Sequence, residues 1–203
     1  MIKARHNRFY IWFFWSYFNW MRKIHFRKMS IRSAVPIPEH ESILLFQNHF
    51  SWWDGYWSYA LCRNVFKRKF HVMMLEEQLR KRMFLNRCGI YSVRKNNRDF
   101  LDSLAYTTEL LDNPKNLVTI YPSGALLSQH QQNVPFLRGI DMVLKGVSGP
   151  FAIVLAVVLI DYFSFVRPEI RIYVQNYSGE KTAKAIENAY LVFYQSCISK
   201  QTE

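Results

Sequence analysis

The chain has 203 residues, enough for one domain with a substantial core and too few for two ordinary domains. Because 50% of the residues are hydrophobic and only 21% are charged, the composition excludes an intrinsically disordered protein. Lysine and arginine outnumber the acidic residues by 27 to 15, a formal net charge of +12 that indicates an anionic partner. That partner is a membrane surface, a nucleic acid, or an acidic or phosphorylated substrate.

The first feature along the chain is an aromatic run, FYIWFFWSYFNW, at residues 9–20. A membrane-spanning helix needs about 20 apolar residues, so this run is too short, and it lacks the cleavage site of a signal peptide. Trp and Tyr favour the boundary between lipid and water, and basic residues flank the run on both sides. We therefore expect a helix that lies on an anionic membrane surface. The alternative is a helix that covers the sheet of the same domain.

After Pro36 and Pro38, which mark a linker, apolar runs alternate with helical patterns. We expect a membrane-associating helical segment at residues 1–35 and the main domain at residues 36–203. Apolar runs predict strands at residues 43–46, 70–75, 90–93, 117–121, 151–160 and 169–174. Helical periodicity predicts helices at residues 56–66, 76–85, 100–111 and 186–197, the third capped by Asp99. This alternation predicts an α/β domain whose largely parallel or mixed sheet is flanked by helices on both faces.

The three cysteines, Cys62, Cys88 and Cys197, contain no CxxC pair and are odd in number. A disulfide framework or a zinc site is therefore not expected, and a reducing compartment is the simpler interpretation. Together with the aromatic run, this predicts a protein at the cytoplasmic face of a membrane.

His49 and Asp54, with four residues between them, lie in the loop QNHFSWWDG after the first strand predicted in this domain. An imidazole takes a proton from a hydroxyl near neutral pH, and a carboxylate on its other ring nitrogen fixes the tautomer. In α/β sheets, ligands bind beyond the carboxyl ends of strands, where this loop and residues 122–124 both lie. His49 is thus a candidate general base with Asp54 as its partner. Alternatively, Asp54 caps the following helix.

Four short sequence segments, which we call blocks, follow one another along the chain, and the first of them contains His49. They are NHFSWWD at residues 48–54, GIYSVRK at 89–95, YPSG at 121–124 and PFLRG at 135–139, followed by an apolar strand at 153–158. This series resembles the glycerolipid acyltransferases, the lysophospholipid or 1-acyl-glycerol-3-phosphate acyltransferase family with its N-H-x4-D motif. The similarity covers roughly residues 40–175, and the order of the blocks is more specific than any one of them.

The resemblance implies that a fatty acyl group moves from acyl-CoA or acyl-carrier protein, as co-substrate, to a hydroxyl of a lysophospholipid or other lipid acceptor, without metal or cofactor. His49 is then the general base and Asp54 its partner. Backbone N–H groups at the start of the next helix are candidate donors to the thioester oxyanion. The positions implied in substrate binding are Arg94, Lys95, Ser123, Gly124 and Arg138. Of these, Lys95 occupies the position that contacts phosphate, with Arg94 beside it.

The third block departs from the family pattern F-P-E-G-T-R. Ser123 stands in place of the Glu and Leu126 in place of the Arg. In the family these two residues are associated with acceptor binding, the Arg with the acceptor's phosphate. The motif therefore does not identify the acceptor lipid, and glycolipids, carotenoid-linked lipids and aminoacyl lipids are alternatives to a lysophosphatidate. The alternative function is a catalytically weak, membrane-bound lipid-binding relative of these enzymes.

Basic runs at residues 67–69 and 80–82 either attract phosphates of a carrier or lipid head group or form a solvated face. A nucleic-acid partner is not expected, because no recognition helix or RNA-binding motif accompanies the basic residues. No metal site is expected, because no companions at metal-ligand spacing accompany His6, His25, His40 and His71.

Overall fold

The structure, a computed structural model, describes residues 1–32, 36–94, 97–131, 133–137 and 139–202. The strands in these residues are β1 Lys28–Arg32, β2 Ser42–Gln47, β3 Lys69–Leu75, β4 Ile90–Val93, β5 Asn116–Ile120, β6 Phe151–Asp161 and β7 Glu169–Tyr177. The helices are α1 Arg8–His25, α2 Asp54–Leu61, the π-helical turn η1 Cys62–Phe66, α3 Glu76–Arg80, the 3-10 turn η2 Met83–Arg87, α4 Asn97–Leu111, α5 Ile140–Gly146 and α6 Ala183–Ser199.

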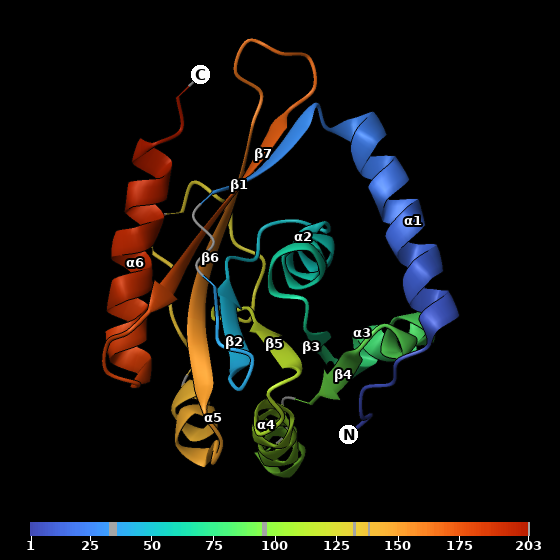
Figure 1. The fold of residues 1–203 in the computed structure, drawn as a ribbon, viewed down its shortest axis with the longest axis vertical. Helices are drawn as coiled ribbons and strands as arrows, with labels where there is room; N and C mark the ends of the chain where they lie inside the picture. Colours follow the sequence, from blue (N-terminus) through green and yellow to red (C-terminus); the bar gives the residue numbers. More distant parts are fainter. Residues whose placement is uncertain (33–35, 95–96, 132, 138, 203) are drawn as a thin grey trace.

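The strands form one sheet in the order β1-β7-β6-β2-β5-β3-β4 (Figure 1). Neighbours run parallel except β6 and β7, which pair antiparallel. The strands from β6 to β4 therefore point one way, and β7 and β1 point the other. Every residue of the central strand β2 is buried, as is typical of parallel strands covered on both faces. The predicted α/β class, with a largely parallel sheet of mixed type, is confirmed.

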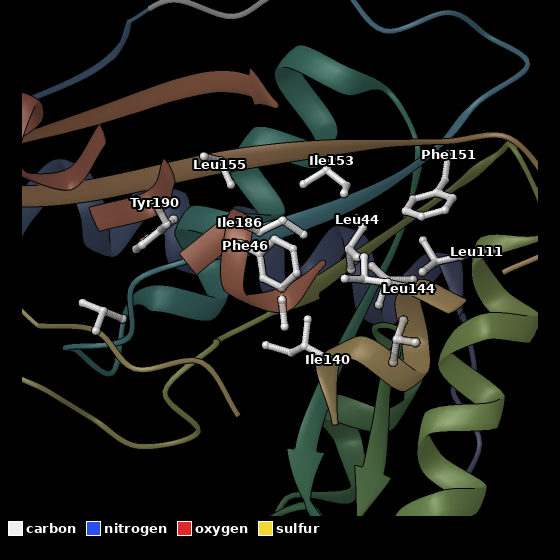
Figure 2. Packing of buried hydrophobic residues seen from close by; sticks show 14 of the residues in the cluster. Leu44, Phe46, Leu111, Ile140, Leu144, Phe151, Ile153, Leu155, Ile186 and Tyr190 are labelled. Carbon is white, nitrogen blue, oxygen red and sulfur yellow. The ribbon is translucent and has the colours of Figure 1, made fainter. Parts of the chain in front are cut away.

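Helices cover both faces of this sheet: α4, α5 and α6 lie on one side, and α1 and α2 lie on the other (Figure 1). Successive residues of a strand point to opposite faces, so β2 divides its side chains between two cores. Leu44 and Phe46 join the core under α4, α5 and α6, whereas Ile43 and Leu45 join the core under α2. Figure 2 shows part of the first core, where apolar side chains of β2, β6, α5 and α6 meet.

Each predicted strand is present, whereas some helices differ from expectation. The segment 76–85 is not one helix, because the backbone leaves the helical conformation at Arg82, whose φ is −139°. α4 begins at Asn97, so Asp99 lies in its first turn instead of capping it, and the Asp99 carboxylate binds Arg94. The short helix α5 was not predicted.

The strand β1 lies inside the segment 1–35 that was expected to be helical. It pairs in parallel with β7, so residues 28–32 belong to the main sheet and form one of its edges. Five residues of mixed polarity give no strand signal of their own, and the partner strand lies near the other end of the chain. The expected domain boundary at residue 35 lies outside the described residues.

α1 is a helix, as the aromatic run predicted, and its inner face packs on the body of the domain. Its N-cap is Asn7, whose side-chain oxygen accepts hydrogen bonds from two backbone N–H groups of the first turn. Trp15 stacks on Tyr56 of α2 with ring centroids 5.5 Å apart, and Phe14 stacks on Phe84 of η2 at 4.8 Å. These contacts hold α1 against the side of the sheet that carries α2.

The outer face of α1 carries a row of exposed apolar side chains. These are Phe9, Trp12, Phe13, Tyr17, Trp20 and Ile24. Their spacing of three and four residues places them on one stripe of the helix. No helix in the described part of the chain is both long enough and apolar enough to cross a membrane.

His71 of β3 is a buried histidine far from the predicted site residues in the sequence. It is 2% exposed, and within the described residues neither of its ring nitrogens has a hydrogen-bond partner. Its ring lies 4.8 Å from that of His6. Burial, and secondarily the neighbouring His6, lowers the pKa of His71 from 6.5 to about 3.

This lowered pKa predicts a loss of stability in acid. Between pH 6.5 and about 3 the unfolded chain binds a proton at His71 that the folded chain does not bind. The free energy of unfolding therefore falls as the pH drops through this window, by up to about 1.4 kcal/mol per pH unit. Urea unfolding at a series of pH values should show a shallower fall for His71→Leu. His40→Leu, in an exposed turn, should follow the wild type, and equal slopes for His71→Leu and wild type would contradict the prediction.

Candidate active site

The carboxyl ends of the parallel strands form one rim of the sheet, the usual place for a ligand site in this fold class. His49 follows β2, and Tyr121 follows β5. Glu76, the first residue of α3, comes directly after β3, and Arg94 comes directly after β4. Because these strands are neighbours in the order β2-β5-β3-β4, the four residues are arranged along the rim in that order. The loop of His49 and the loop of Ser123 share this rim, as the sequence predicted.

His49 and Asp54 form a hydrogen-bonded pair. His49 Nδ1 lies 2.7 Å from Asp54 Oδ2. The Asp54 side chain is fully buried, whereas the His49 side chain remains 29% exposed. Since a carboxylate accepts, Nδ1 carries the proton and Nε2 keeps its lone pair. The pair therefore has the arrangement of a general base and the group that orients it.

The Asp54 carboxylate is held by four hydrogen bonds from one loop. Its Oδ2 accepts from His49 Nδ1 and from the backbone N–H groups of Phe50 and Ser51, at 2.7 and 2.8 Å. Its Oδ1 accepts from the Ser51 hydroxyl at 3.0 Å. The amides that it binds precede α2, and the N-cap residue of α2 is Trp53, without a side-chain cap. The alternative role of Asp54 as a cap of the following helix is therefore wrong.

Backbone N–H groups at the start of α2 were expected as donors to an oxyanion. Those of Tyr56 and Trp57 donate to the Trp53 carbonyl, and that of Asp54 lies 3.3 Å from the Ser51 carbonyl. These three amides are thus already hydrogen-bonded within the turn. They give no support to an oxyanion site at this end of α2.

Tyr121 lies against the ring of His49, a contact that the sequence did not reveal. The two rings are stacked with centroids 4.3 Å apart and an interplanar angle of 16°. The Tyr121 hydroxyl is 3.0 Å from the hydroxyl of Ser58, which also lies 3.0 Å from Gln47 Oε1. Ser58 and Gln47 are fully buried. No local sequence signal indicates this contact, because Tyr121 reaches His49 only through the pairing of β5 with β2.

The loop after β5 is fastened to the His49 loop and to β6. The Leu127 N–H donates to the His49 carbonyl at 2.8 Å. The Gln129 side-chain amide pairs with both backbone groups of Ile160, at 2.8 and 3.0 Å. The Asn48 side-chain amide pairs in the same way with Val158, at 2.8 Å in both bonds. These contacts tie the start of the His49 loop to β6 and to the loop after β5.

The third block forms a turn at the edge of the site. Gly124 has a φ of +58°, in the left-handed region that favours glycine, and a Cβ on it would come within 2.6 Å of Leu137 Cδ1, so any other residue would be strained there. The Ser123 hydroxyl donates to the Ala125 carbonyl at 2.8 Å and so stabilises the turn. Leu126, at the position of the family's Arg, is 63% exposed and directly precedes Leu127.

Arg94 is held by two carboxylates at the end of β4. Its guanidinium lies 2.6 Å from Glu76 Oε1 and 2.8 Å from Asp99 Oδ2. The Arg94 guanidinium is the main reason that the pKa of Glu76 falls to about 2. A phosphate at Arg94 therefore has to compete with these ion pairs. The other two basic positions implied in substrate binding, Lys95 and Arg138, lie outside the described residues.

Comparisons with known proteins identify the family and the fold. A family model described as Acyltransferase matches residues 28–160, from β1 into β6, and this range includes His49 and Asp54. The crystal structure of PlsC, the 1-acyl-sn-glycerophosphate (LPA) acyltransferase from Thermotoga maritima, has a similar fold, with a TM-score of 0.60 and 11% identity over 95% of this chain and 80% of that one. No curated protein sequence matches. The chain belongs to the Acyltransferase family, and it is an acyltransferase.

Proposed function

We propose that the protein transfers a fatty acyl group from acyl-CoA or acyl-carrier protein to a hydroxyl of a lysophospholipid or other lipid, with His49 as the general base. One observation carries the proposal: buried Asp54 binds His49 Nδ1, which leaves Nε2 with its lone pair on a partly exposed ring. A base at this position serves an acceptor that arrives from outside. The intact pair favours catalysis over the alternative of a catalytically weak lipid-binding relative.

The reaction needs one base that later acts as an acid. His49 Nε2 takes the proton of the acceptor hydroxyl while the oxygen attacks the thioester carbonyl carbon, and Asp54 stabilises the imidazolium that forms. The tetrahedral intermediate then collapses, the carbon–sulfur bond breaks, and the leaving thiolate takes the proton from Nε2. The products are an ester and a free thiol. Every atom comes from the two substrates and His49, so the proposed mechanism includes no metal and no cofactor.

The third block supports an acceptor other than a lysophosphatidate. Leu126 is exposed directly before Leu127, whose N–H binds the His49 carbonyl, so an apolar side chain stands near the base at the family's Arg position. Ser123 uses its hydroxyl within the turn. A phosphate placed there gains no ion pair from either side chain. We therefore propose a lysophospholipid with a larger head group, or another hydroxyl lipid.

A transfer assay with defined substrates tests this function. Purified protein is given labelled palmitoyl-CoA or palmitoyl-acyl-carrier protein together with lysophosphatidate, lysophosphatidylethanolamine, lysophosphatidylglycerol, a monoglycosyl lipid or a total lipid extract. We expect an acylated product with at least one acceptor, and less with lysophosphatidate than with the preferred one. Absence of transfer from both thioesters to every acceptor, extract included, would refute the proposal.

We also propose that the outer face of α1 binds an anionic membrane surface at the cytoplasmic side. The exposed aromatic stripe and the basic residues that flank it have the composition of an interfacial helix. Trp52, between His49 and Asp54, is 64% exposed, and its ring lies 5.3 Å from that of Phe18 in α1. The apolar surface of α1 thus continues into the loop of the base. The three free cysteines support a reducing compartment.

Removal of two tryptophans from this stripe should weaken membrane binding. For the double variant Trp12→Ala and Trp20→Ala, we expect affinity for phosphatidylglycerol vesicles to fall by about tenfold or more per tryptophan, because each ring loses apolar burial in the lipid boundary. Vesicle flotation measures this. The matched control, Leu101→Ala with Val192→Ala, removes exposed apolar groups from α4 and α6 on the opposite side. Equal binding by the two double variants would contradict the prediction.

A further inference from the structure

We propose that Tyr121 is a positioning residue for the proposed base His49, held in place by a buried hydrogen-bond chain through Ser58 and Gln47 to the backbone of Asp54. This inference rests on the proposed function, because it assigns to Tyr121 a part in the work of His49. The stacked contact between the two rings and the chain of hydrogen bonds behind Tyr121 carry it.

The bond from Asp54 fixes only one edge of the His49 ring. A ring held by a single hydrogen bond at Nδ1 can still tilt about that bond, and tilting moves Nε2 away from its productive direction. The Tyr121 ring, stacked at 4.3 Å and 16°, blocks movement toward one face. The two contacts together hold Nε2 in one direction, which is the condition for an oriented base.

The position of Tyr121 is itself determined by a directed chain of donors. Ser58 has one hydroxyl proton, and two of the oxygens within its reach, Gln47 Oε1 and the Asp54 carbonyl, only accept, both at 3.0 Å. The proton goes to one of these two, so Ser58 accepts from the Tyr121 hydroxyl, also at 3.0 Å. Gln47 Nε2 then donates to the Asp54 carbonyl at 3.3 Å. The chain starts at the ring beneath His49 and ends on the residue that binds Nδ1. Both supports of His49 are therefore parts of one buried network.

Tyr121 also contacts the imidazolium that His49 becomes during the reaction. Proton abstraction makes His49 an imidazolium, and the electron-rich face of the phenol ring attracts a cation that lies over it. Burial raises the pKa of Tyr121 far above its ordinary value, so its hydroxyl stays protonated and does not act as a second base. The contribution of Tyr121 is thus one of position and charge stabilisation, without proton transfer.

Four variants of the full chain test this assignment by steady-state kinetics. Tyr121→Leu removes the ring and should lower kcat about tenfold with KM changed less than about twofold, because a stacked ring pair contributes on the order of one factor of ten. Tyr121→Phe keeps the ring and should recover most of kcat. Ser58→Ala removes the acceptor of the Tyr121 hydroxyl and should match Tyr121→Phe. The double variant of these two should be no slower than either one, since both break the same bond.

Tyr91 provides matched controls away from the site. It is fully buried, and its hydroxyl lies 2.7 Å from that of Thr107. Tyr91→Phe and Tyr91→Leu remove the same atoms as the Tyr121 variants, so they report the kinetic effect of lost stability alone. An unchanged kcat in Tyr121→Leu, or equal losses in Tyr91→Leu and Tyr121→Leu, would overturn the inference. If Tyr121→Leu does not fold, the double variant of Tyr121→Phe and Ser58→Ala decides: a loss of kcat equal to the sum of the two single losses would overturn the inference. Full activity of His49→Ala refutes the proposed function instead.

Discussion

Replacement of His49 by alanine is expected to lower kcat for acyl transfer by about 10²- to 10⁴-fold, the usual contribution of a general base. Without the imidazole, the acceptor hydroxyl has to attack the thioester with its proton in place, and the leaving thiolate finds no acid. KM should change little, because the ring is only partly exposed and binds the acceptor through one nitrogen. Initial rates with a labelled acyl thioester and the preferred acceptor measure both parameters.

The control for this substitution is His40→Ala. His40 lies in an exposed turn before β2, so its loss removes an imidazole from the surface and should leave the rate unchanged. Thermal unfolding of both variants checks that each one is folded. A His49→Ala variant that retains at least half of the wild-type kcat would show that another group removes the proton.

Asp54→Asn should lower kcat by a comparable factor, about 10⁴-fold, while the protein stays folded. The amide oxygen of asparagine can accept the hydrogen bonds that Oδ2 accepts from His49, Phe50 and Ser51. The fold therefore keeps its contacts, but the negative charge that stabilises the imidazolium is lost. Asp54→Ala should also destabilise the fold, by about 1–3 kcal/mol for each buried donor left without a partner.

The structure offers a matched control in Asp112. Its Oδ1 accepts from the backbone N–H groups of Ser148 and Gly149 at 2.8 and 2.9 Å, a similar bond pattern away from the rim. Asp112→Asn should therefore keep full activity. Calorimetry measures the loss of stability, and the transfer assay measures the loss of activity. An Asp54→Asn variant that is active, or one that is inactive only because it is unfolded, would contradict the assigned role.

The alternation of apolar runs and helical patterns was sufficient to predict the class of the fold. Strands such as β2 and β6 are buried on both faces, so their sequences are continuous apolar runs that are visible without a structure. β1 and α5 could not be predicted in this way. KMSIR becomes a strand only because β7 offers it a partner, and the short helix α5 has no room for a helical period.

The residues of the site show the same difference between features that the sequence predicts and features that depend on the fold. His49 and Asp54 are close in sequence and carry an ordered motif, so the pair could be predicted, and the structure places them in contact. Tyr121 approaches His49 only because β5 lies beside β2 in the sheet, a fact of topology with no local signal. For the same reason, the pairing of Arg94 with Glu76 required the structure, since the partners follow two different strands.

The pairing of β1 with β7 has a consequence for the order of events during synthesis. α1 leaves the ribosome long before β7, the strand that pairs with β1 directly after the helix. At about 5–20 residues per second, the roughly 140 residues between β1 and β7 take on the order of ten seconds to make. During this time β1 has no partner, and neither face of the aromatic helix is shielded by a completed sheet. The membrane surface that we propose for α1 therefore has access to the helix before β7 completes the sheet.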